Sequence, residues 1–226
     1  MKKLFSIFVL VATVAATTFF TSCSEDNDNT VPDITLGGQA NMDIVINSVG
    51  NWVEPGFTAT DNKDGDITSK VVITGTVDVT KLGTYVITYR VEDEAGNYIV
   101  VERTVNVIVN NQTYVASYAV VDVITGPGSG TYNYTVTASI SSIDTGKILL
   151  ANFGGYGNTQ IAYFTFTKEG VISIPSQHVT GSPGFEGTLQ GTGTTADNGN
   201  VLNITYSYTY DDGSGTDNGT ATYTKR

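Results

Sequence analysis

Apolar and polar residues alternate with a period of two along much of the chain. Within residues 84–92 the alternate positions are apolar, namely Tyr85, Ile87, Tyr89 and Val91. A later run repeats the pattern with Ile204, Tyr206, Tyr208 and Tyr210. Successive side chains of a β-strand point to opposite faces, so this pattern predicts strands with one face against a core. No stretch with a helical period competes with them.

The pattern divides the folded part of the chain into two β units joined by the polar residues 110–112. In the first unit, residues 32–109, turn residues separate strand candidates at 43–47, 71–76, 84–92 and 98–109. Strands this short, at this spacing, favour a β-sandwich of about 80 residues. The whole chain is therefore predicted to be all-β.

The second unit, residues 113–226, is predicted to hold about eight strands in a meander. The candidates lie at 114–124, 131–140, 147–152, 160–167, 171–174, 185–193, 201–210 and 220–224. Such a meander favours an up-and-down antiparallel barrel, and a second β-sandwich is the alternative. The tyrosines of this unit stand where the apolar face should be. Core packing is therefore the expectation for them, and a binding surface in the barrel mouth is the alternative.

The N-terminus has a different pattern. Two lysines precede an apolar run over residues 4–20, and an acidic polar stretch follows at residues 24–28. This layout predicts a secretory signal over residues 1–22 and a linker over residues 23–31. A transmembrane anchor is the alternative, although no positive cluster follows the apolar run. Cys23 is the only cysteine, so it cannot form a disulfide within the chain.

The charge and the scarcity of catalytic residue types limit the possible functions. The net charge of −11 disfavours nucleic acid as a partner. A single histidine argues against a cluster of histidine metal ligands and gives little support to a Ser-His-Asp triad. We therefore expect no enzyme activity and no cofactor. A glycoside hydrolase that uses two carboxylates is the enzymatic alternative.

Three aromatic residues are candidates for ligand contact. Trp52, the only tryptophan, lies near a predicted loop, where its indole could stack on a sugar or close one end of the sandwich. Phe153 and Tyr156 lie in a glycine-rich loop and are expected to form an exposed aromatic pair.

Clustered carboxylates in residues 61–66 raise the question of calcium. Asp61, Asp64 and Asp66 offer the oxygen ligands that this ion prefers. The spacing does not fit a helix-loop-helix calcium loop, because Lys63 holds the third position and Val72 the twelfth. Turn formation is the simpler explanation, so no metal is expected.

Three parts of the chain resemble known families. Thr21-Ser22-Cys23 resembles the lipobox of bacterial lipoproteins, and the acidic residues 24–28 resemble the export tag of Bacteroides-type surface lipoproteins. This resemblance implies a lipid on Cys23 and an outer-membrane anchor that faces the cell exterior. Residues 55–61, 64–68, 83–85 and 93–97 are similar to a bacterial Ig-like domain, which implies a spacer or adhesive module.

The second unit resembles the lipocalin-like domains that end many such lipoproteins, on residues 148–157, 172–177 and 221–225. These resemblances together imply a non-enzymatic surface lipoprotein that binds glycan or assists a glycan-uptake system. Its expected partners are polysaccharide or outer-membrane uptake proteins. A structural or protein-interaction subunit of a cell-surface complex is the alternative.

Overall fold

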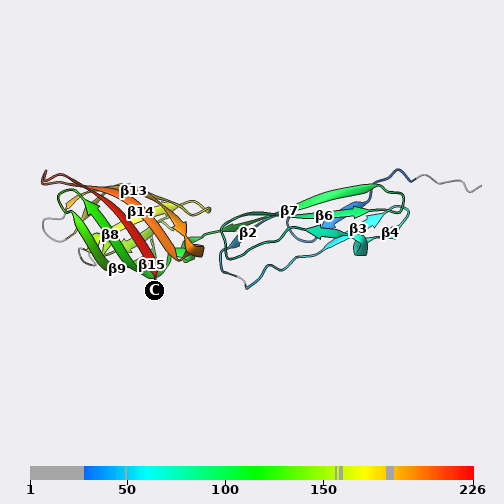
Figure 1. The fold of residues 1–226 in the computed structure, drawn as a ribbon, viewed down its shortest axis with the longest axis horizontal. Helices are drawn as coiled ribbons and strands as arrows, with labels where there is room; N and C mark the ends of the chain where they lie inside the picture. Colours follow the sequence, from blue (N-terminus) through cyan, green and yellow to red (C-terminus); the bar gives the residue numbers. More distant parts are fainter. Residues whose placement is uncertain (1–27, 49, 156, 158–159, 182–185) are drawn as a thin grey trace, which may run out of the picture.

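The computed structural model describes residues 28–48, 50–155, 157, 160–181 and 186–226. These residues form two β units that lie end to end (Figure 1), with strands β1–β7 in the first and β8–β15 in the second. The described N-terminal residues lie at the end of the first unit farthest from the second unit. Among the described residues, no helix is long and apolar enough to cross a membrane.

The first unit consists of two sheets. One contains β1 (Asp33–Leu36), β3 (Phe57–Asp61) and β4 (Gly65–Asp66). The other has the order β2 (Asn41–Val45), β7 (Tyr98–Ile108), β6 (Gly83–Glu92) and β5 (Val72–Thr74). Strand β2 runs parallel to β7, and the other pairs are antiparallel. This arrangement confirms the predicted sandwich and adds β1 and β3, which strand prediction did not identify.

The interior of the first unit combines an apolar cluster with a buried arginine. Apolar side chains of both sheets meet there, among them Ile34, Ala59, Ile87 and Tyr89. Arg103 of β7 is fully buried. Its guanidinium donates hydrogen bonds to the carbonyl oxygens of Gly37, Gln39 and Gly56, to the Glu54 carboxylate and to the Tyr89 hydroxyl. These bonds attach the loops at residues 37–39 and 54–56 to β7.

The second unit is a closed antiparallel barrel, in which each strand pairs with the next and β15 pairs with β8. Its strands in the described residues are β8 (Ala116–Thr125), β9 (Gly130–Ile140), β10 (Ile148–Ala151), β11 (Ile161–Phe166), β12 (Val171–Thr180), β13 (Glu186–Ala196), β14 (Val201–Tyr210) and β15 (Thr216–Lys225). The barrel prediction is confirmed over the alternative of a second sandwich. Strands β12 and β15 are longer than predicted.

Side chains fill the barrel. Leu189, Leu202 and Ile204 are fully buried in it, and Tyr206 and Tyr208 are 7% and 6% exposed. The predicted core role is therefore confirmed for Tyr206 and Tyr208. It is wrong for Tyr132, near the start of β9, which is 42% exposed. The cavity beside Phe153 and Tyr208 has a volume of only about 10 Å³, which is about the minimum that holds one water molecule. It leaves no room for a larger ligand at this point.

The two units share part of their core. Ile46, Val107 and Val109 of the first unit belong to the same apolar cluster as the barrel core. Between them, residues 110–112 lead into a short helix, α1 (Asn111–Tyr114), whose first turn is capped by the Asn110 side chain. The polar joint expected from the sequence is thus a packed connection.

Candidate functional site

A groove on the outer wall of the barrel is lined by two rows of polar side chains. In one row, Gln190 of β13, Ser207 of β14 and Asn218 of β15 are cross-strand neighbours. In the other row, Thr192, Thr205 and Thr220 follow each other in the same way. These positions point outward because residues at odd and even positions of a strand face opposite sides of the wall.

The inward positions between these rows are occupied by Gly191, Tyr206 and Gly219, which are also cross-strand neighbours. A Cβ atom added to Gly219 would lie 2.2 Å from Cζ of Tyr206. A Cβ atom added to Gly191 would lie 2.9 Å from the Cβ atom of Tyr206. Only glycine at these positions lets the Tyr206 ring lie directly against the wall. The floor of the groove is therefore thin and backbone-lined.

The groove has the size and chemistry of a site for a neutral polar ligand. Its volume is about 650 Å³, within the range of ~300–1,000 Å³ that is usual for small-molecule sites. None of the described residues that line it carries a charge. Hydroxyl and amide side chains can both donate and accept hydrogen bonds, which suits a ligand rich in hydroxyl groups.

A buried carboxylate lies behind the groove floor. Asp122 of β8 is fully buried, and its Oδ2 accepts hydrogen bonds from the hydroxyls of Tyr206 at 2.7 Å and Tyr134 at 2.9 Å. Burial raises the pKa of Asp122 above its ordinary value, although these two hydrogen bonds partly oppose the shift. The network fixes the Tyr206 ring behind the groove.

Trp52 lies in the first unit and not on the barrel. Its side chain is half-buried and lines a second hollow of about 400 Å³ together with Glu54, Ile73 and Thr76. The structure therefore gives the indole both a packing role and access to a hollow. A ligand role for Trp52 stays a prediction.

The prediction that Phe153 belongs to an exposed aromatic pair is wrong. Its side chain is 2% exposed and packs edge-on against Tyr206, with ring centroids 5.2 Å apart. The positive φ angles of Gly154 and Gly155 turn the chain so that the phenyl ring points into the barrel. Tyr156 lies outside the described residues, as does Cys23.

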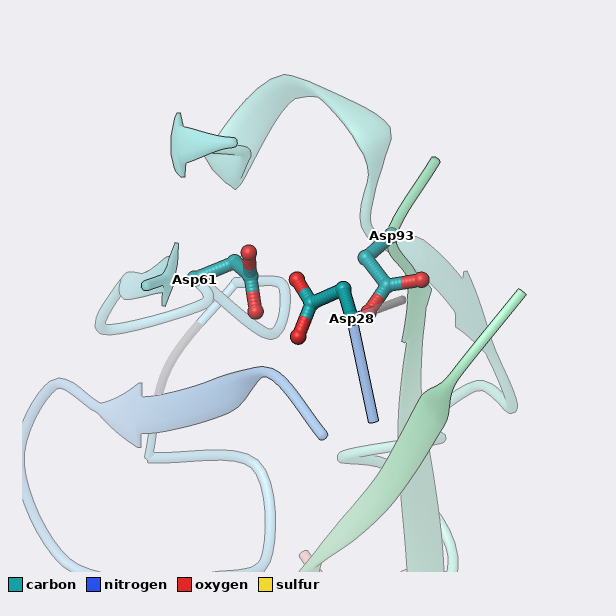
Figure 2. A group of neighbouring side chains, drawn as sticks. All are labelled: Asp28, Asp61 and Asp93. Carbon is teal, nitrogen blue, oxygen red and sulfur yellow. The ribbon is translucent and has the colours of Figure 1, made fainter. Parts of the chain in front are cut away.

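In the fold, the three calcium candidates have different neighbours. Asp64 accepts a hydrogen bond from the Glu94 N–H and pairs with Lys70, and Asp66 accepts one from the Thr68 N–H. Asp61 instead lies beside Asp28 and Asp93, as Figure 2 shows. Sequence reasoning missed these two partners because they are far from Asp61 in the chain.

The turn carboxylates of the second unit, from which a hydrolase would draw its catalytic pair, do not form part of the groove. Glu169, Glu186, Asp144, Asp197, Asp211 and Asp212 are all exposed. Asp211 pairs with the sole histidine, His178, at 2.7 Å. The groove residues were missed for a simple reason: serine and threonine on the outer face of a strand look like ordinary solvent-facing residues.

Comparison with known proteins identifies the first unit. Residues 34–107 match the family model described as bacterial surface protein, Ig-like domain. The first unit is an Ig-like domain of bacterial surface proteins. The match assigns the Ig-like domain to a type that occurs on bacterial cell surfaces. No curated protein matches the chain.

Solved structures resemble the chain only remotely. A lipoprotein from Bacteroides thetaiotaomicron is 21% identical, with 86% of this chain and 100% of that one covered and a TM-score of 0.37. A structure of CBM51-2 in complex with GlcNAc and INT domains from Clostridium perfringens ZmpB is 23% identical, with 79% and 29% covered and a TM-score of 0.29. A Bacteroides ovatus protein of unknown function is 11% identical, with 65% and 59% covered and a TM-score of 0.35.

Proposed function

We propose that this protein is a non-enzymatic, lipid-anchored accessory protein of the outer membrane that binds glycan in the outer groove of its barrel. The observation that carries the proposal is the uncharged lining of the groove, with its two rows of hydroxyl and amide side chains. Polysaccharides present many neutral hydroxyl groups, and each can pair with such a side chain.

The shape of the wall also supports a glycan ligand. The rows cross β13, β14 and β15, so one extended chain of sugar units could meet several hydrogen-bonding groups in succession. Val123 of β8, which is 48% exposed, adds an apolar surface at the same groove. The apolar faces of sugar rings can pack on such a side chain.

The anchor follows from the N-terminal residues. The lipobox-like residues 21–23 and the acidic stretch behind them support cleavage before Cys23 and acylation of its sulfur. More than one acyl chain would be needed for a firm anchor, because a single chain binds membranes only marginally. The described N-terminal residues lie at the far end of the Ig-like domain, so that domain would hold the barrel away from the membrane.

A glycan screen with groove variants tests the proposal. The folded chain from residue 24 onward is expected to bind at least one bacterial, plant or host polysaccharide. The double variant Gln190→Ala/Asn218→Ala should weaken that binding at least tenfold, because it removes two amides from one row. Asn133→Ala is the matched control, since it changes an exposed amide of β9 that does not line the groove.

Two results would contradict the groove assignment. A broad screen in which the folded chain retains no polysaccharide would reject glycan binding altogether. Binding that survives the double variant but is lost in Trp52→Ala would move the site to the hollow of the Ig-like domain.

Docking to another surface protein is the second candidate function. The strands of the barrel close into a ring, whereas β5 lies at the edge of its sheet in the Ig-like domain. Its residues Val72 and Ile73 are 57% and 43% exposed, and an exposed edge strand can pair with a strand of a partner. Ile73→Pro should abolish co-purification of a partner from solubilised membranes while leaving glycan binding unchanged.

A further inference from the structure

Three aspartates meet at the end of the Ig-like domain that is farthest from the barrel. Asp61 ends β3, Asp93 follows β6, and Asp28 precedes β1. One carboxylate oxygen of each lies within 4.8 Å of those of the other two. Figure 2 shows the three carboxylate groups turned toward one another from different segments of the chain.

Two of these aspartates are buried, and the hydrogen bonds to one of them are incomplete. Asp61 and Asp93 are 8% and 7% exposed. Oδ1 of Asp61 accepts hydrogen bonds from the N–H groups of Lys63 and Asp64, whereas its Oδ2 is buried without a hydrogen-bond partner. A buried carboxylate oxygen without a partner is costly, so it calls for a ligand.

Hydrogen bonds from a neighbouring amide hold two of the three aspartates in place. Asn97 donates hydrogen bonds to both oxygens of Asp93 and, through Nδ2, to the carbonyl oxygen of Asp28. Lys70 pairs with Asp64 and Glu94 at 3.6 Å.

The spacing of the oxygens fits calcium. Ca²⁺ binds oxygens at about 2.3–2.6 Å, so two ligands on opposite sides of the ion lie up to ~5 Å apart. The limit of 4.8 Å between the carboxylate oxygens therefore matches a single ion placed among them. Mg²⁺ needs shorter distances and a stricter octahedral geometry.

We propose that Asp28, Asp61 and Asp93 form a Ca²⁺ site that ties the segment before β1 to the end of the Ig-like domain. Asp61 and Asp93 supply a rigid half of the site from two loops, and Asp28 closes it. Ion binding removes the repulsion among the three carboxylates and gives the Asp61 Oδ2 a partner. The segment that leads to the predicted anchor is then held against the domain.

Calorimetric titration with Ca²⁺, on the full chain freed of metal with a chelator, tests the site. One Ca²⁺ per chain is expected, together with a higher unfolding temperature of the Ig-like domain. Asp61→Asn and Asp28→Asn should each weaken Ca²⁺ binding at least tenfold. Asp33→Asn, an exposed aspartate in β1, is the matched control and should bind as the parent does. Amide hydrogen exchange at residues 29–31 should slow in Ca²⁺ only when Asp28 is present.

The same measurements can overturn the proposal. Folded parent protein without a saturable Ca²⁺ heat rejects the site, as does binding that both Asp61→Asn and Asp28→Asn retain. Equal affinity for Mg²⁺ rejects calcium as the ion. If Asp66→Asn loses Ca²⁺ binding and Asp28→Asn keeps it, the ion binds to the loop over residues 61–66 and the proposed site is wrong.

Discussion

Between its two sheets the Ig-like domain buries a guanidinium beside a small apolar cluster, whereas the barrel buries two carboxylates, Asp122 and Asp217, within a larger apolar and aromatic cluster. Arg103 reaches the backbone of two loops as well as Glu54 and Tyr89, so polar bonds position those loops. In the barrel, the Asp122 network is surrounded by a large apolar cluster. The Ig-like domain thus positions its loops through a buried cation, and the barrel places its buried carboxylates within a core that is mainly close-packed apolar side chains.

The largest effect is expected when the buried guanidinium is removed. Arg103→Met should destabilise the Ig-like domain by about 3–5 kcal/mol, because it removes a buried guanidinium that pairs with the partly buried Glu54 and leaves several carbonyl oxygens without donors. Urea unfolding followed by fluorescence measures this loss, since the sole tryptophan, Trp52, lies in the same domain. Tyrosine circular dichroism should show a nearly unchanged barrel transition.

Arg90→Met is the matched control for this variant. Arg90 forms its ion pair with Glu92 at the exposed surface, where such pairs contribute about 0–1 kcal/mol. Equal losses in the two variants would show that Arg103 does not hold the Ig-like domain together.

A smaller loss is expected when the barrel wall is overpacked. Gly219→Ala should cost about 1–3 kcal/mol in the barrel transition, because its Cβ would lie 2.2 Å from the Tyr206 ring. Gly146→Ala is the control, as the nearest atom to its Cβ is the Asp144 Oδ1 at 3.3 Å. A barrel that tolerates both changes equally would contradict the tight contact behind the groove.

The smallest and most specific effect concerns the pH dependence of the barrel. Burial raises the pKa of Asp122 in the folded state, so between the unfolded pKa and this raised pKa the folded barrel holds a proton that the unfolded chain has released. The barrel should therefore lose stability as pH rises above the unfolded pKa of about 3.9, by ~1.4 kcal/mol for each unit of pKa shift. Asp122→Asn should remove this part of the slope while its oxygen still accepts the tyrosine hydroxyls.

Thermal unfolding between pH 4 and pH 8 measures this slope. The exposed Asp144→Asn variant provides the control, and its pH profile should follow that of the parent. A parent and an Asp122→Asn variant with the same pH profile would show that Asp122 does not titrate differently in the folded barrel.

The alternation of residues was sufficient to predict much of the fold. Strands β6 and β14 were identified nearly to the residue, and their apolar faces are the buried ones. This success has a local cause: a strand displays its two faces through every second residue. The short strands β1 and β3 were missed because turn-forming residues flank them, Pro32 and Gly37 around β1 and Gly56 before β3.

The candidate sites could be predicted only in part. Asp61 and Trp52 were singled out by residue type, but Asp28 and Asp93 join Asp61 only through the fold. Phe153 was expected at the surface, although the turn at Gly154 and Gly155 directs its ring inward. The burial of Arg103 was also invisible, because arginine within a strand is usually exposed.

The sequence by itself determined the strand periodicity, the division into two β units and the placement of the sole cysteine after an apolar run. Only the tertiary structure decided that β15 closes the barrel on β8, that polar rows of neighbouring strands line one groove, and that three distant aspartates meet. The physical reason is that periodicity follows from neighbouring residues. Register, closure and the meeting of loops instead depend on contacts between residues that are far apart in the chain.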